Sequence, residues 1–422
     1  MFWKNLLNYR FVNKLFTFLC FVTAPATGSA VSFIWHGGAL WCLFEIVTGR
    51  RSFSRDRAMW VMTILLFVYC LVIAASTAWN SQTMGDMRHL LRLATLLLFP
   101  FSYSLWSISD KSDVARTSIL ASMIACYAGF AVAAFQYYYL GERAWGGAGN
   151  PIVFGTVISL AGSVSLAGIF FLQDRKLVLP LVGAFAASWI GLIYSGTRAL
   201  WITSFLVTVA ILWIYRRTLS RYISPRNAVI IAAIFVAIAA AGAPTVADRM
   251  GKVAADWDKL TVNDQQETSL GVRLSLWEMA LDLVQQRPFI GYGMGSTRQL
   301  ITTGLRDQYG LDFTFTHFHN GFATSAVEAG LLGLVALLAI FAAAAATAFR
   351  CFRDSKDEVE RFGATLLVIL VVTYMISGLT NIILGHDILD TMMVIFLITG
   401  TYLAAGTSRL PLSDPNAAGK AA

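Results

Sequence analysis

Charged residues are scarce in this chain, and their scarcity argues against a water-soluble fold. They make up 13% of the 422 residues, whereas hydrophobic residues make up 57%, and the mean hydropathy is +0.64. With so few polar groups, a globule of this length would expose too much apolar surface to water. The composition therefore indicates an integral membrane protein.

Cysteine and histidine are also rare, with five of each. The cysteines lie in apolar stretches or at the end of one, so the long polar segment late in the chain has neither a disulfide nor a thiol metal site. We interpret them as packing residues: Cys20, Cys42, Cys70, Cys126 and Cys351. His317 and His319 alone are too few ligands for zinc, and no P-loop or dinucleotide fingerprint occurs. We expect no metal and no cofactor, so an enzyme with this sequence would need a substrate that arrives already activated.

Long apolar stretches fill most of the sequence. A helix that crosses a bilayer needs about 20 apolar residues, and about twelve stretches approach this length. They lie near residues 11–28, 30–48, 58–79, 89–107, 117–140, 151–172, 177–194, 200–215, 227–247, 319–349, 362–380 and 385–405. The chain therefore divides into nine predicted spans over residues 1–247, a polar segment over 248–318, and three spans with a tail over 319–422.

Basic residues in short loops predict the orientation of these spans. Placing the N-terminus in the cytoplasm puts about two thirds of the 32 Lys and Arg residues on the cytoplasmic side. Both termini are then cytoplasmic, and the segment 248–318 lies outside. The net charge of +8 is mostly a signal of topology, so nucleic-acid binding is a poor explanation of it.

The outer segment contains one predicted amphipathic helix. Five apolar residues recur in it at spacings of 4, 3, 4 and 3, which places them on one side of a helix: Leu270, Leu274, Trp277, Leu281 and Val284. Pro288 ends the pattern. We expect this helix to lie against the bilayer surface or to cap the transmembrane bundle. No internal repeat relates the two halves of the chain, which counts against a transporter.

Three outward arginines are candidates for binding an anion. Arg198 follows the short Ser195-Gly196-Thr197 turn, where an arginine is costly unless it meets an anion or a headgroup. Arg273 lies one helical turn before Trp277, and its guanidinium matches phosphate oxygens in a bidentate fork. Arg143 lies in a glycine-rich loop. A headgroup anchor for Arg198, a solvated side chain for Arg273 and simple turn formation by the glycines are the alternatives.

His319 is the candidate proton acceptor. It precedes the tenth predicted span, and a neutral imidazole accepts a proton near neutral pH. Asn320 follows it, and His317 lies two residues before it. The N–H groups at the start of this span are expected to favour a phosphate. Helix capping or contact with a headgroup is the alternative for the histidine.

Two carboxylates are further candidates for supporting this site. Glu328 lies about 13 Å deeper along the tenth span than His319, where a carboxylate needs a partner or a proton. Asp387, next to His386 and near Asp390, marks an outer turn before the last span. These residues could orient the site, but helix capping explains them equally well.

These residues resemble a known family. The stretch His319-Asn320-Gly321-Phe322-Ala323 with Gly330 is similar to the His-Asn-x-x-Leu-x6-Gly pattern of the bacterial O-antigen ligase superfamily. Ala323 replaces the usual leucine. That superfamily also includes O-antigen polymerases and protein O-oligosaccharyltransferases. The resemblance implies an all-α integral membrane protein of about twelve transmembrane helices, with one large periplasmic loop that contains an amphipathic helix.

The resemblance also implies an activity. It is that of a metal-independent, inverting glycosyltransferase in the bacterial inner membrane, with its site facing the periplasm. An undecaprenyl-diphosphate-linked O-antigen is the implied donor, and the lipid A-core oligosaccharide is the implied acceptor. Arg198 and Arg273 would bind the diphosphate, and His319 would take the proton from the acceptor hydroxyl.

The alternatives fall into two classes of function. O-antigen polymerases and protein O-oligosaccharyltransferases use the same kind of lipid-linked donor and differ in the acceptor. The chain shows no added soluble domain after the last predicted span, which disfavours the larger protein-glycosylating members. A transporter or flippase is the lower alternative, because its charged residues would line a central path, whereas the candidate residues here gather at one face.

Overall fold

The computed structural model describes residues 9–81, 87–222, 229, 233, 236, 240, 243–248, 250–252, 255–258 and 267–408. All regular secondary structure in these residues is helical, and they contain no strand. The predicted helical class is therefore confirmed. The predicted ninth span at 227–247 falls largely outside the described residues.

Eight helices are long and apolar enough to cross a membrane, judged by length and composition. They are α4 (Ala30–Val47), α5 (Arg57–Asn80), α9 (Lys111–Tyr138), α10 (Pro151–Leu172), α11 (Arg175–Ser195), α17 (Gly321–Asp354), α18 (Glu358–Ser377) and α19 (Asp387–Ala405). Each of them matches a predicted span. The chain is therefore a multi-pass membrane protein.

The other predicted spans have shorter or interrupted helices. The first contains α2 (Tyr9–Val22) and α3 (Ala24–Thr27), and the eighth contains α12 (Arg198–Ile214), which α13 (Arg216–Tyr222) follows. The stretch 89–107 is divided into the 3-10 helix η1 (Arg88–Leu93), α7 (Ala94–Leu97) and α8 (Phe99–Trp106). A total of twelve spans therefore stays a prediction.

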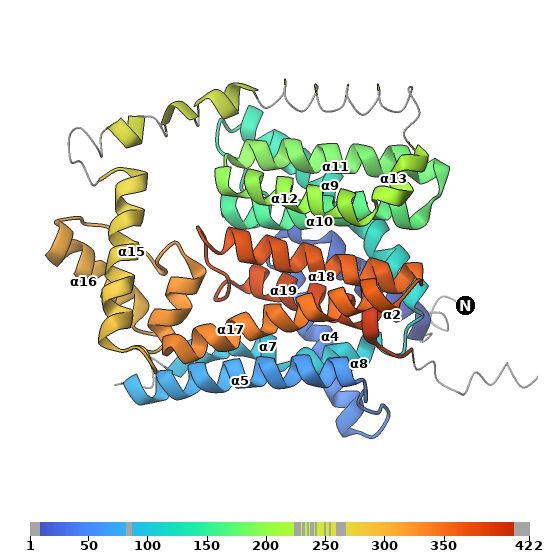
Figure 1. Ribbon diagram of the computed structural model, residues 1–422, viewed down its shortest axis with the longest axis horizontal. Coiled ribbons are helices and arrows are strands. Elements are labelled where there is room, and N and C mark those ends of the chain that lie inside the picture. The colour runs from blue at the N-terminus through green and yellow to red at the C-terminus, as the bar shows by residue number, and fades with distance from the viewer. Residues whose placement is uncertain are drawn as a thin grey trace, which may run out of the picture.

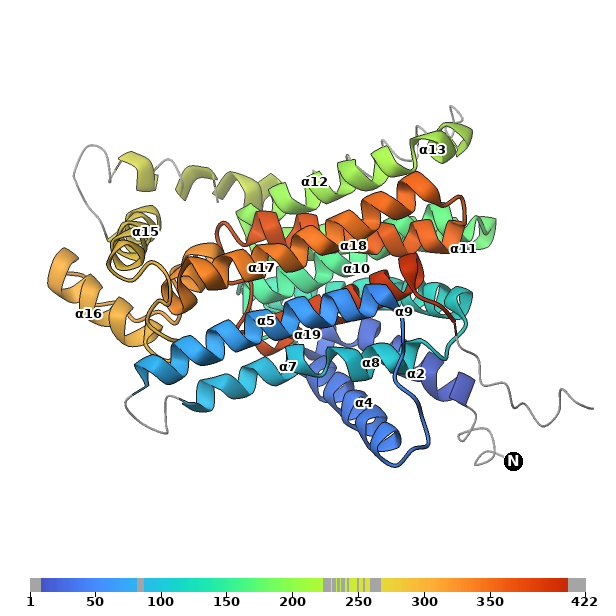
Figure 2. The ribbon, with the colours of Figure 1, turned by 60° about the horizontal axis from the view of Figure 1, so that its bottom comes forward.

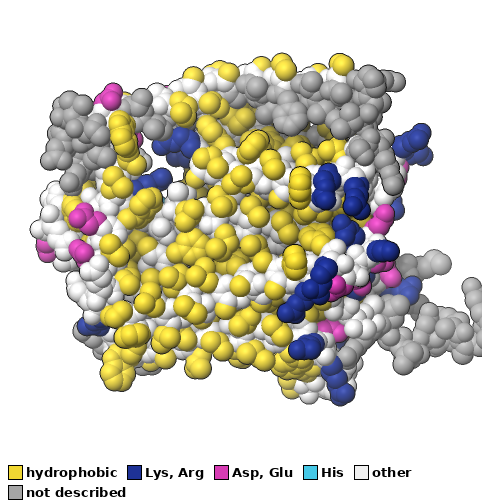
Figure 3. All heavy atoms as spheres, in the orientation of Figure 1, with side chains coloured by type: hydrophobic (Ala, Val, Ile, Leu, Met, Phe, Trp, Pro, Cys, Tyr) yellow, Lys and Arg dark blue, Asp and Glu magenta, His cyan; other side chains and the backbone are white. Residues whose placement is uncertain are grey.

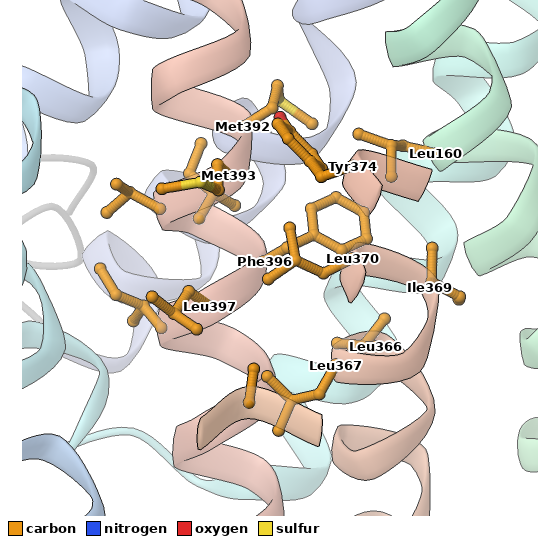
Figure 4. Packing of buried hydrophobic residues seen from close by; sticks show 14 of the residues in the cluster. Leu160, Leu366, Leu367, Ile369, Leu370, Tyr374, Met392, Met393, Phe396 and Leu397 are labelled. Carbon is orange, nitrogen blue, oxygen red and sulfur yellow. The ribbon is translucent and has the colours of Figure 1, made fainter. Parts of the chain in front are cut away.

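The spanning helices run side by side along one axis, and α15 (Ser269–Gln286) and α16 (Thr297–Tyr309) lie at one end of them (Figures 1 and 2). Helices α10 and α19 form the interior, because 94% of the residues in the apolar stretch of each are buried. Figure 4 shows aromatic, aliphatic and methionine side chains of α18 and α19 interlocking beside Leu160 of α10. A broad hydrophobic band covers the face in Figure 3, and basic side chains gather beyond it. This distribution fits a bilayer around the band.

The two end helices, α15 and α16, are joined by their own small core. Val272, Leu276 and Met279 of α15 pack with Ile301 and Leu305 of α16. Helix α15 also packs against α17. The small core therefore fixes α15 and α16 to each other and to the transmembrane bundle.

Only part of the predicted apolar side of α15 packs, where Trp277 and Val284 lie against the small core. Leu274 and Leu281 are 43% and 59% exposed, whereas Gly271, Ser275 and Ala280 are buried. Small residues on the packed side permit close approach of the neighbouring helices, and a search for large apolar residues overlooks them. The predicted end of the helix before Pro288 is confirmed.

Helix α17 is broken about two and a half turns after its start. Ala329 and Gly330 leave the helical conformation, with φ of +66° at Gly330. The carbonyls of Val327 and Glu328 that the break releases accept hydrogen bonds from the N–H groups of Tyr292 and Gly293. The segment between α15 and α16 is therefore bonded into the break and ties both helices to α17.

Replacement of Gly330 by alanine is expected to destabilise the protein. A Cβ atom there would lie 2.2 Å from the carbonyl carbon and oxygen of Phe289, and φ is positive. We expect a loss of at least about 2 kcal/mol, measured as a lower thermal unfolding midpoint of the purified protein. Gly37→Ala is the control, because nothing lies within 4 Å of that position. Equal midpoints for the two variants would contradict this account of the break.

Candidate active site

The site begins at the start of α17, where Asn320 caps the helix. Its side-chain oxygen accepts hydrogen bonds from the N–H groups of Phe322 and Ala323 at 3.0 and 3.1 Å. The N–H of Gly321 donates to the carbonyl of Gly378 at 2.7 Å. The expectation that these N–H groups favour a phosphate is wrong, because the cap and the neighbouring turn already use them. Asn320 therefore fixes the start of α17 directly after His319.

That residue, His319, has a left-handed backbone with φ of +49°. Such a conformation is uncommon for residues other than glycine and recurs at functional sites. Its ring lies edge-on to Phe315 at 5.0 Å and 4.7 Å from the ring of His317. Within the described residues, its Nδ1 atom is buried and has no hydrogen-bond partner. The fold holds this imidazole in a defined place without using its nitrogens for structure.

Both imidazoles are neutral at physiological pH. Burial lowers the pKa of His319 to about 4, and the charge of Arg273 adds to this effect. Burial likewise lowers the pKa of His317 to about 4, with further contributions from the two other histidines of the site and from Arg273. A neutral imidazole has a lone pair available for a proton.

Arg273 approaches these histidines from α15. Its side chain is half-buried, and burial followed by the charge of Arg198 lowers its pKa. Among the described residues, no acidic group or hydrogen-bond acceptor pairs with it. Two guanidinium groups that repel each other are stabilised when an anion lies between them. Figure 3 shows basic side chains beside an opening between the α15 region and the bundle.

Arg198 is held by the turn that the sequence predicts. Helix α11 ends at Ser195, Gly196 takes a φ of +64°, and Arg198 begins α12. The Thr197 hydroxyl donates to the carbonyl of Pro151 at 3.3 Å, and the Ser195 hydroxyl donates to that of Thr197 at 3.1 Å. These bonds fix the turn on the start of α10 and orient the arginine after it.

Arg143 braces the same turn from the glycine-rich loop. Its Nε donates to the carbonyl of Ser195 at 2.9 Å, and the N–H of Ala144 donates to the carbonyl of Tyr194 at 3.0 Å. The glycines of this loop pack closely on other backbone: a Cβ on Gly147 would lie 2.2 Å from the carbonyl oxygen of Ala26. The structure therefore favours turn formation over ligand contact for the loop.

The two candidate carboxylates have partners within the protein. The Thr297 hydroxyl donates to Glu328 at 2.9 Å, which supplies the partner that the depth of this carboxylate requires. Asp387 lies 3.2 Å from Nδ1 of His386 in the turn before α19. Glu328 thus links α17 to α16, and Asp387 pairs with His386, the third histidine near the site.

Arg92 is a neighbour of the site that sequence reasoning missed. It lies in η1. Burial lowers the pKa of His386, the carboxylate of Asp387 opposes this effect, and the charge of Arg92 adds to it. The charge of His386 in turn contributes to the lowered pKa of His317. The signal was the same as for Arg198: an outward arginine near the end of an apolar stretch.

Fold and site together define a multi-pass membrane protein with a basic, histidine-containing site at one end of its helical bundle. Residues 183–338 match the family model described as O-Antigen ligase. This match over part of the chain confirms the resemblance and supports a membrane enzyme of glycosyl-transfer type. The match includes Arg198, Arg273 and His319, whereas Arg143, Arg92 and Asp387 lie outside it. A comparison with curated proteins finds no match.

Proposed function

We propose that this protein transfers an O-antigen glycan from undecaprenyl diphosphate to the lipid A-core oligosaccharide. One observation carries the proposal. Three separate parts of the chain bring two arginines and a neutral histidine into electrostatic contact at one end of the bundle: Arg198, Arg273 and His319. Cations suit a diphosphate, and the uncharged imidazole suits a general base.

The proposed reaction is a single displacement. His319 takes the proton of the acceptor hydroxyl as that oxygen attacks the anomeric carbon of the sugar. The bond from this carbon to the diphosphate oxygen breaks with its electron pair, and the configuration at the carbon inverts. Arg198 and Arg273 stabilise the negative charge that develops on the diphosphate, so the leaving group needs no proton from an acid and no metal ion.

The proposed location is the bacterial inner membrane with the site in the periplasm. Basic residues support it, because most of them fall in segments assigned to the cytoplasm. The domain division at 247/248 and 318/319 follows from the same assignment. A cysteine at Gln285 should react with an impermeant thiol reagent in intact spheroplasts, whereas one at Lys356 should react only after lysis. The reverse pattern would remove the site from the periplasm.

The lipopolysaccharide of a strain that lacks this gene tests the function. We expect core without attached polymer, together with accumulated lipid-linked polymer, and recovery of both when the gene is restored. A core that carries a single repeat unit would contradict the ligase proposal and indicate a polymerase. Unchanged lipopolysaccharide with altered glycoproteins would indicate a protein-glycosylating enzyme.

A further inference from the structure

The two end helices enclose a groove that the proposed reaction does not use. It measures about 440 Å³ and lies between the C-terminal half of α15 and helix α16. This volume is in the range of small-molecule sites. Both helices lie at one end of the bundle in Figures 1 and 2, so the groove lies at that end and not among the spanning helices.

The chemistry of the groove differs from that of the arginine and histidine site. Its polar lining consists of amides, hydroxyls and a single carboxylate: Gln286, Gln299, Gln308, Ser296, Thr303 and Asp282. No Lys or Arg is among the residues that line it, so it does not suit a phosphate. Leu283, Leu300 and Met279 provide apolar surface beside the polar groups.

Several polar groups in the groove have unused hydrogen-bonding capacity. The side chains of Asp282, Gln299 and Gln308 are exposed and make no hydrogen bond to other described residues. Gln286 is held in place, because its side-chain oxygen accepts from the Tyr292 hydroxyl at 3.1 Å. Carboxylate and amide groups bind the hydroxyls of a polyol as both donors and acceptors, and apolar surface covers the C–H faces of sugar rings.

The walls of the groove are fixed before any ligand binds. Gly304 brings α16 close to α15, since a Cβ there would lie 2.2 Å from the sulfur of Met279. The small core described above fastens the same two helices. A preformed site loses less entropy on binding than a site that must assemble.

We infer that this groove is a glycan subsite, which binds uncharged sugars of the donor or of the acceptor core away from the reacting groups. The inference rests on the proposed function. Asp282 follows Arg273 by nine residues, which is about 13 Å along α15 and two and a half turns around it. The groove therefore holds sugars remote from the diphosphate, and it contributes to binding and not to the displacement itself.

Gln299→Trp tests the subsite, and Gln285→Trp is its matched control. Both glutamines are exposed on the end helices, but only Gln299 lines the groove. Transfer by the purified, full-length protein is measured with lipid-diphosphate-linked glycans of one repeat and of many repeats. It is then measured with full and truncated core acceptors.

We expect Gln299→Trp to raise KM by about tenfold for either the long donor or the full core, through the loss of one or two hydrogen bonds. Transfer of one repeat to truncated core should match the wild type, as should every reaction of Gln285→Trp. If KM rises for the long donor, the groove binds sugars of the donor, and if it rises for the full core, the groove binds sugars of the acceptor. Asp282→Asn, which keeps the size of the side chain, should shift the same KM in the same arm.

An equal change in all arms, or none, for both Gln299→Trp and Asp282→Asn would overturn the subsite. Failure of the wild type to transfer even one repeat would instead refute the proposed function. The two failures are therefore distinguishable. Thermal unfolding of each variant separates a loss of binding from a loss of fold.

Discussion

Replacing His319 by alanine is expected to lower turnover by about 10²- to 10⁴-fold, which is the usual contribution of a positioned general base. Binding of the lipid-linked donor should persist, because the diphosphate contacts belong to the arginines. His319→Asn should be equally slow. Asparagine tolerates the left-handed backbone at this position, where φ is +49°, so this variant removes the base and keeps the conformation.

The pH dependence of the reaction should carry the signature of this base. The pKa of His319 is lowered to about 4 by burial and by Arg273, so the free enzyme holds it neutral at all higher pH. The profile of kcat/KM, which reports the free enzyme, should rise through about pH 4 and then level off. A bound diphosphate brings negative charge beside the imidazole and raises its pKa. The profile of kcat, which reports the enzyme with its substrates bound, should therefore rise at a higher pH than the profile of kcat/KM. The imidazole is then a stronger base when the donor is bound.

His317→Ala is the control for these measurements. The ring of His317 packs 4.7 Å from that of His319 and has a pKa lowered in the same way. Its loss should cost no more than about tenfold in turnover, because it removes a neighbour and not the base. Near-normal turnover and an unchanged profile in His319→Ala would show that the histidine only positions the substrate. The base would then have to be sought elsewhere.

The sequence predicts the parts of this site that depend on short-range chemistry. The turn before Arg198 needs only a glycine able to take positive φ, and Gly196 does so. The partner of Glu328 follows from the cost of an unpaired carboxylate at that depth, although its identity as Thr297 does not. The eight spans follow from length and hydropathy alone.

The parts that could not be predicted depend on contacts between distant segments. The N–H of Gly321 is taken by the carbonyl of Gly378, so the start of α17 has lost the anion affinity that an isolated helix start would have. Arg143 supports the turn before Arg198 because α11 ends beside its loop, where its Nε donates a hydrogen bond to the carbonyl of Ser195. The packed side of α15 combines Val272, Leu276 and Met279 with small residues, which hydropathy ranks below the leucines on its exposed side.

Arg198→Ala and Arg273→Ala are each expected to lower kcat/KM by at least about 10²- to 10³-fold, the scale of losing one preorganised group that stabilises charge in the transition state. Lysine should restore little at either position. It keeps the charge but lacks the planar fork that binds two phosphate oxygens at once. Transfer assays with purified variants and lipid-linked donor measure both effects. Arg306→Ala is the control, because that arginine is exposed and pairs with Asp307.

The double variant separates a shared clamp from two independent contacts. Burial, and then the charge of Arg198, lowers the pKa of Arg273, so the two guanidinium groups interact electrostatically, as expected of groups that act on one anion. Removing both should then cost less than the product of the single losses, since the second arginine contributes less once the diphosphate is misplaced. Near-normal transfer by both lysine variants would mean that charge alone suffices, and the bidentate clamp would fail. Strictly multiplicative losses would mean that the two arginines act independently on separate anions. The two phosphates of one diphosphate are too close together for such independence, so this result would contradict the shared clamp.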